Sequence, residues 1–181
     1  MHKESIIILY NMKFIVDNRE RKIIENLSKQ IPDKYELQNL QIGDFIFEVD
    51  NTPLVIIERK TIQDLASSIK DCRYKEQKMR LLNEKNKGVQ IIYLLEGDID
   101  VKTGGIPAST FTSVIINSMV RDGIYTYISK NVETTCNILI KINKLIESNK
   151  TDLLKQQPST LIEYASCIKK ITFKKSAKLL L

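Results

Sequence analysis

Short apolar runs alternate with longer stretches of helical periodicity from residue 13 to residue 148, and this alternation constrains the fold more than any other feature. Strand patterns occupy residues 13–17, 35–40, 44–60 (as a hairpin), 90–96 and 124–128, and helix patterns occupy residues 19–29, 62–86, 109–120 and 133–148. Strands that alternate with helices form a central mixed sheet with helices on both faces. The sequence therefore predicts an α/β domain over residues 13–148.

Composition excludes several kinds of site. Hydrophobic residues make up 43% of the chain and no apolar run approaches the roughly 18 residues of a membrane span, so we expect an intracellular protein that does not enter a membrane. The three cysteines lack Cys-x-x-Cys spacing, which favours reduced thiols over a zinc site. The single histidine, His2, argues against a Ser-His-Asp triad, a histidine-metal nuclease and a deaminase-type zinc centre, because each needs an imidazole in the site.

A predicted β-hairpin carries the most informative charged residues. Residues 44–49 alternate loosely, residues 54–57 are continuously apolar, and the four residues between these runs have turn chemistry. Strand side chains alternate between the two faces of a sheet, so Glu58 and Lys60 share one face while Arg59 points to the other.

The open end of this hairpin predicts a metal site. It brings Asp44 beside Glu58 and Lys60, and two carboxylates suffice as the protein's share of a Mg²⁺ site next to a phosphate. We predict that Asp44 and Glu58 hold the ion and that Lys60 orients the attacking water or offsets charge in the transition state.

The same residues belong to a wider set of spaced motifs. The set comprises Val16-Asp17-Asn18-Arg19-Glu20, Gly43-Asp44, Glu58-Arg59-Lys60 with Asp64 three residues further on, the stretch Ser67–Leu81, Ile106–Thr110 and Arg121-Asp122-Gly123. In these motifs the chain resembles the XPF-type structure-selective endonucleases, and within them the catalytic subunits of the MUS-type crossover junction endonucleases. The resemblance covers roughly residues 13–148 and implies a restriction-endonuclease-like core. One departure is Cys72, which stands where the family usually has glycine and where we expect a local packing change.

The resemblance implies a role for each motif residue. The catalytic set is Asp44, Glu58, Lys60, Asp64, Asp17, Arg19 and Glu20; the DNA contacts are Arg59, Arg73 and Gln77; and the ligands of Mg²⁺ or Mn²⁺ are Asp44, Glu58 and the backbone carbonyl of Arg59. The substrates that it implies are branched DNA with 3′ flaps, forks or nicked junctions. It also implies a homodimer, or a heterodimer with a related subunit, working in the nucleus or at another site of DNA replication or repair.

Several of these residues have a purely structural alternative. Thr61 and Asp64 have the spacing of a helix capping box. Asp17 is placed to cap the helix that follows it, and Glu20 to favour that helix's N-terminal dipole. Arg73 and Gln77 lie four apart on one helical face, as solvated polar residues often do. The Arg59 side chain is assigned to a salt bridge or to a DNA phosphate.

Residues 149–181 are predicted to be a basic tail. Residues 150–181 contain seven Lys and Arg against two Asp and Glu, whereas residues 1–149 contain 21 against 20. Excess positive charge favours contacts with phosphates, although a solvated lysine-rich end has the same composition. We expect this tail to lead toward a helix-hairpin-helix region that the sequence does not contain. Two alternatives to the nuclease remain: a non-catalytic DNA-binding or dimerisation subunit, and a junction resolvase or restriction-type nuclease on the same core.

Overall fold

A computed structural model describes residues 11–154 of the 181-residue chain. The strands are β1 (Met12–Asp17), β2 (Glu36–Gln38), β3 (Phe45–Val49), β4 (Thr52–Thr61), β5 (Gln90–Glu96) and β6 (Tyr125–Ser129). The helices are α1 (Arg21–Gln30), α2 (Ile62–Lys70), α3 (Arg73–Asn86), α4 (Ala108–Ile116), the π-helical turn η1 (Asn117–Arg121) and α5 (Val132–Leu154). The predicted basic tail lies outside the described residues from position 155 onward.

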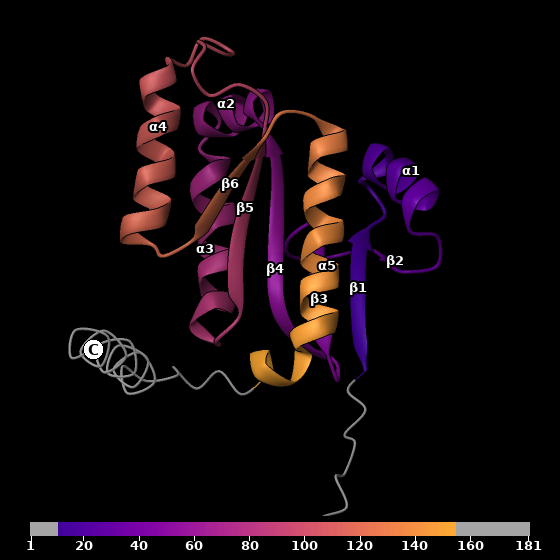
Figure 1. Cartoon of the computed structure of the whole chain (residues 1–181). Helices are drawn as coiled ribbons and strands as arrows, with labels where there is room; N and C mark the ends of the chain where they lie inside the picture. The colour runs from indigo at the N-terminus through magenta and orange to yellow at the C-terminus, as the bar shows by residue number, and fades with distance from the viewer. Residues whose placement is uncertain (1–10, 155–181) are drawn as a thin grey trace, which may run out of the picture. The chain divides into compact units, whose positions relative to one another are not determined.

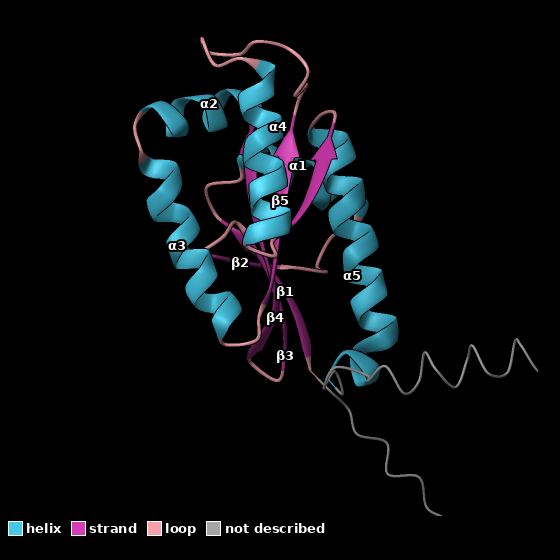
Figure 2. Ribbon diagram, turned by 90° about the vertical axis from the view of Figure 1, so that its left-hand side faces the viewer, coloured by secondary structure: helices cyan, strands magenta, loops and turns pink. Residues whose placement is uncertain are grey.

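The strands form one mixed sheet in the order β2-β1-β3-β4-β5-β6. Strands β1, β3 and β4 pair antiparallel, while β4, β5 and β6 pair parallel, so β4 joins the two halves. Helices α1 and α5 lie on one face of the sheet, and α2, α3 and α4 lie on the other (Figure 1; Figure 2). The predicted α/β fold, with a mixed sheet and helices on both faces, is confirmed.

The alternation along β4 decides which side chains face each helical layer. Ile56 belongs to the buried core formed with α2, α3 and α4, together with residues such as Leu65 and Leu81. Since side chains alternate along a strand, the residues two and four positions after Ile56 point to this same layer. These residues are Glu58 and Lys60, so the core that fixes Ile56 also fixes where the two charged side chains emerge.

The single long helix predicted over residues 62–86 is wrong. The structure divides it into α2 and α3, and Cys72 at the break has a left-handed backbone with φ of 59°. Glycine adopts this conformation without the steric cost that a Cβ imposes, so Cys72 occupies a position that favours glycine. No glycine or proline marks the break in this chain, so the periodicity alone did not reveal it.

The remaining boundaries differ less. The helix predicted to end at residue 120 changes at Asn117 into the π-helical turn η1, and α5 extends to Leu154. The predicted hairpin is present, but its turn is shorter than the four residues expected: Asp50 and Asn51 have positive φ (51° and 60°), as a tight two-residue turn requires, and Thr52 and Pro53 already belong to β4. Within residues 11–154, no helix combines the length and apolar character needed to cross a bilayer.

Candidate active site

A polar pocket of about 150 Å³ opens between the segment before β3, the second half of β4, and α3. Its lining residues are Arg19, Gln41, Ile42, Gly43, Asp44, Glu58, Gln77, Arg80 and Leu81. Both carboxylates predicted to hold a metal therefore lie in one cavity. The hairpin brings them there from positions 14 residues apart in the sequence.

The backbone of β4 holds Asp44 in place. Its own N–H donates to the carbonyl of Ile57 at 2.8 Å, and its Oδ2 accepts from the N–H of Arg59 at 2.8 Å. Gly43 makes this close approach possible, because an added Cβ would lie 2.4 Å from Ile56 Cγ2 and φ is +72°. The aspartate is thus fixed by main-chain groups of β4 at both its N–H and its carboxylate.

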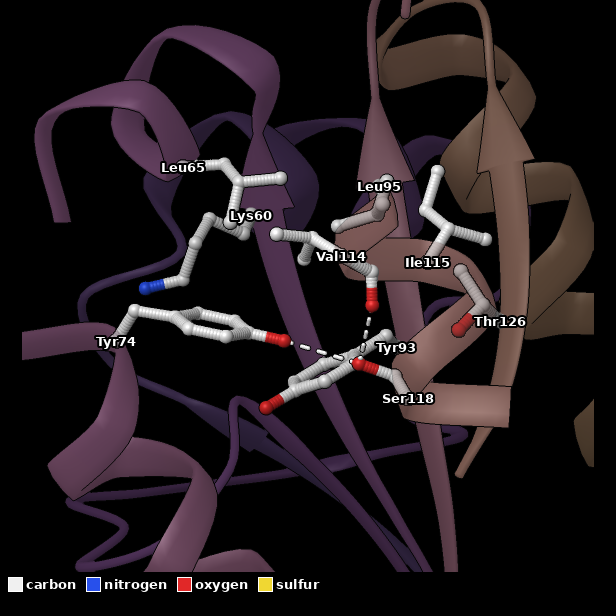
Figure 3. Close-up of a pocket in the computed structure, with 9 residues that line it drawn as sticks. All are labelled: Lys60, Leu65, Tyr74, Tyr93, Leu95, Val114, Ile115, Ser118 and Thr126. Carbon is white, nitrogen blue, oxygen red and sulfur yellow. Dashed lines mark hydrogen bonds between the residues drawn. The ribbon is translucent and has the colours of Figure 1, made fainter. Parts of the chain in front are cut away.

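Lys60 is held close to Glu58 by its contacts with α3. Its Nζ donates to Gln77 Oε1 at 2.5 Å and lies 3.9 Å from Glu58 Oε1. The aliphatic part of Lys60 lines a small, mainly apolar cavity together with Leu65 and Tyr74 (Figure 3). Packing and a hydrogen bond therefore both restrict the position of the ammonium group.

Burial raises the pKa of both carboxylates of the pocket. Burial raises the pKa of Asp44 to about 8, and the negative charges of Glu58 and Glu20 add to this effect. The pKa of Glu58 is also raised, chiefly by burial, while Lys60, Arg19 and Arg80 oppose the rise. The pocket therefore gains electrostatically from a cation placed between the carboxylates.

The donor set suits Mg²⁺ or Mn²⁺. These ions take oxygen ligands, usually one or two carboxylates with waters and substrate phosphate. The N–H and C=O of one strand residue point to the same side, so the carbonyl of Arg59, whose N–H reaches Asp44, also points away from β5. In the described part of the chain, no group of three or more His, Cys, Asp or Glu side chains suited to a metal occurs. Asp44, Glu58 and that carbonyl as the ligands of a metal ion stay a prediction.

Asp17 acts on the pocket through Arg19. The carboxylate is fully buried and accepts four hydrogen bonds: from the Arg19 N–H, Nε and Nη2 and from the Leu40 N–H, at 2.7–2.9 Å. These bonds, led by those of the Arg19 side chain, lower the pKa of Asp17. The aspartate's oxygens are thus occupied, and it does not line the pocket. Arg19, whose side chain is 72% exposed, is held there with its guanidinium at the rim.

Arg59 lies on the opposite face of the sheet and is bound by two glutamates. Its guanidinium forms two hydrogen bonds with Glu96, at 2.7 and 3.0 Å, and one with Glu20 at 2.9 Å. Of the two roles expected for this side chain, the structure shows the salt bridge. The group is 12% exposed, so a DNA phosphate would have to displace one of its carboxylate partners.

Asp64 and Arg73 lie outside the pocket. Asp64 forms the capping box with Thr61, giving its N–H to Thr61 Oγ1 at 3.0 Å and accepting the hydroxyl proton at Oδ2 at 2.6 Å. Arg73 pairs with Asp71 at the exposed start of α3. The structural alternatives for both residues are therefore seen, and their expected roles in catalysis and DNA contact stay predictions.

Arg80 is a pocket residue that sequence reasoning missed. It lies three residues after Gln77 on α3, and positions three and four apart share one face of a helix. Its charge acts on the pKa of Glu58, which places it within electrostatic reach of the carboxylates. Extending the helical face from Gln77 by one turn was the signal that would have found it.

Comparisons with known proteins identify the family of the chain. The family model described as "ERCC4 domain" matches residues 16–142. The chain is 32% identical over 161 residues to the probable crossover junction endonuclease mus81 of Dictyostelium discoideum, and 31% identical over 150 residues to an ERCC4 domain-containing protein of African swine fever virus. These matches cover 74% and 78% of this chain but 17% and 38% of the two relatives.

A solved structure shares the fold. The structure of XPF from Aeropyrum pernix in complex with DNA superposes with a TM-score of 0.59 at 20% sequence identity, covering 83% of this chain and 76% of the other. The ERCC4 match spans most of residues 13–148, the region in which the motifs and the pocket lie. The chain therefore belongs to the ERCC4 domain family, as a nuclease domain of the XPF/MUS81 type.

Proposed function

We propose that this chain is the nuclease domain of a metal-dependent DNA endonuclease that cleaves phosphodiester bonds in branched DNA. The observation that carries the proposal is the meeting of Asp44 and Glu58 at one polar pocket, both with raised pKa, with the Lys60 Nζ 3.9 Å from Glu58 Oε1. The names of the relatives and the DNA complex of XPF support a DNA substrate. Such an enzyme works in the nucleus or at another site of DNA replication or repair.

The residues of the pocket divide the chemistry among them. Bound Mg²⁺ or Mn²⁺ would supply a Lewis acid that neutralises phosphate oxygens and acidifies a water molecule. Asp44 and Glu58 would hold this ion. Lys60, restrained by Gln77, places a positive charge beside the reacting phosphate, where it orients the nucleophile and offsets developing negative charge.

Two arginines at the rim suit the DNA backbone. Arg19 and Arg80 both line the pocket and their side chains are more than half exposed. Arg80 pairs with the exposed Glu76, so it can reach a phosphate without leaving a buried partner, whereas Arg19 would contact a phosphate while it is still held by the buried Asp17. Arginine binds phosphate with two parallel hydrogen bonds, which fixes the strand as well as attracting it. We assign positioning of the scissile strand to these two residues together with Gln77.

The substrate class is tested by cleavage of matched 3′-flap, fork, nicked-junction, four-way-junction and linear duplex DNA with Mg²⁺. We expect flaps, forks and nicked junctions to be cut near the branch and the linear duplex to be cut least. Equal cutting of the linear duplex would favour a restriction-type nuclease on this fold. Binding to every substrate without cutting any would favour a non-catalytic subunit.

We further propose that the domain pairs with a second subunit of the same fold through the β6 edge of the sheet. The exposed apolar residues Met119, Tyr125 and Tyr127 border a groove of about 540 Å³ between this edge and α5. Contiguous exposed apolar surface of this kind often marks a site where another protein binds. Sedimentation should show a species of about twice the 20.9 kDa chain mass. A monomer alone at high concentration would contradict self-pairing.

A further inference from the structure

A buried chain of hydrogen bonds links helix α5 to Arg59. Thr135, in the first turns of α5 and fully buried, donates its hydroxyl to Glu96 Oε2 at 2.7 Å. Glu96 at the end of β5 holds the Arg59 guanidinium through both of its oxygens. The hydroxyl of Ser129, at the end of β6, forms a second hydrogen bond with the Thr135 hydroxyl at 2.7 Å.

Arg59 continues this series of hydrogen bonds from one face of the sheet to the pocket on the other face. Its side chain lies on the α1 and α5 face, but its N–H donates to Asp44 Oδ2 on the pocket side at 2.8 Å. The carbonyl of the same residue points to the same side as that N–H. The orientation of one residue therefore sets both a hydrogen bond to a carboxylate of the pocket and the direction of a carbonyl beside it.

We propose that Thr135 and Glu96 are positioning residues for the metal site, acting through Arg59 from the far face of the sheet. The inference rests on the proposed metal-dependent function and adds two residues to it. The bonds fix Glu96 at both oxygens: each binds the guanidinium, and Oε2 also accepts the threonine hydroxyl. Without the Thr135 hydroxyl, the Glu96 carboxylate and the Arg59 guanidinium bound to it can rotate together. The backbone N–H and carbonyl of Arg59 are then held less firmly.

The effect expected is a loss of metal affinity without loss of fold. Groups that orient metal ligands from outside the ligand set typically change affinity by 10- to 100-fold when removed. Thr135 is the outermost member of the chain of contacts, so Thr135→Val should weaken Mn²⁺ binding by roughly tenfold, at the low end of that range. Thr135→Ser keeps the hydroxyl and should restore binding to nearly the parental value.

The experiment measures binding of Mn²⁺ alone to the full chain, by the loss of the free-ion electron paramagnetic resonance signal, without DNA. Cys136→Ala is the matched control, because Cys136 is the next residue of α5, is buried, and contacts the Ile23 carbonyl instead of Glu96. Circular dichroism and urea unfolding check that each variant folds. If Thr135→Val does not fold, Glu96→Gln tests the same link, since it keeps the shape of the side chain and removes its charge.

The outcomes separate this inference from the function on which it rests. A parental protein that binds no Mn²⁺ would overturn the metal site itself. Parental binding that is unchanged in Thr135→Val and in Glu96→Gln would overturn the positioning role and leave the metal site intact. If Thr135→Val and Cys136→Ala weaken Mn²⁺ binding equally, and each loses stability to the same degree, the cause is general destabilisation of α5 and the proposal is overturned. Weakening in Thr135→Val with rescue by Thr135→Ser would support it.

Discussion

Glu58→Gln is expected to fold as the parental protein does and to lose cleavage of branched DNA by about a thousandfold or more. The substitution removes one of the two carboxylates available to a divalent ion in the pocket. Metal stabilisation of a transition state amounts to several kcal/mol, and each 1.36 kcal/mol corresponds to about tenfold in rate. Folding should survive because Glu58 lies near another negative charge, Asp44, and loses little when its own charge is removed. The one favourable ion pair that the substitution removes is the contact with Lys60, which is weak at 3.9 Å.

The measurement is single-turnover cleavage of a 3′ flap with Mg²⁺. Glu36→Gln is the matched control, since Glu36 is exposed on the edge strand β2 and does not line the pocket. The control should cut at the parental rate. Parental cutting by Glu58→Gln, with circular dichroism showing a native fold, would show that the pocket is not the catalytic centre.

Asp44→Asn is expected to make the metal-free protein more stable at alkaline pH. The folded-state pKa of Asp44 is about 8, whereas an unperturbed aspartate has a pKa of 3.8. Between these values the native protein holds a proton that the unfolded chain has released, so stability falls as pH rises through about 4 to 8 and is lowest above pH 8. Asparagine does not titrate. It can still accept the Arg59 N–H, and it should recover a few kcal/mol at pH 9, with about 6 kcal/mol as an upper bound.

Urea unfolding in the presence of a chelator, at pH 5 and at pH 9, measures this difference. The gain of Asp44→Asn over the parental protein should be much larger at pH 9, because the parental carboxylate is mostly protonated at pH 5. Saturating Mn²⁺ at pH 9 should stabilise the parental protein and leave the variant nearly unchanged. Equal pH dependence in the two proteins would mean that Asp44 is not the group whose charge is costly in the fold.

The fold was largely predictable because its signals are local. Strand and helix periodicities identified the sheet and both helical layers, and β5 was predicted with its observed bounds, Gln90–Glu96. The break between α2 and α3 was missed, because it depends on the conformation of Cys72, and cysteine is not a residue that marks such a break. The π-helical turn after α4 likewise has no sequence signal of its own.

The pocket was predictable where local geometry forms it. The hairpin and the two-residue alternation placed Asp44, Glu58 and Lys60 at one point; the structure puts Asp44 and Glu58 in one pocket and the Lys60 Nζ 3.9 Å from Glu58 Oε1. The contacts of Asp17 with the Leu40 N–H and of Glu96 with Thr135 join residues 23 and 39 positions apart. Such pairings follow from tertiary packing, and one sequence gives no periodic pattern from which to derive them.

The division of the sheet at β4 bears on when the site becomes competent during folding. Asp44 and the Arg59 N–H meet across only 15 positions, through a tight turn, so closing that loop costs little chain entropy. The bonds that orient Arg59 span 37 positions to Glu96 and a further 39 from there to Thr135. A partly folded chain can thus gather its acidic groups early, while their final alignment waits until the last strand and helix have docked.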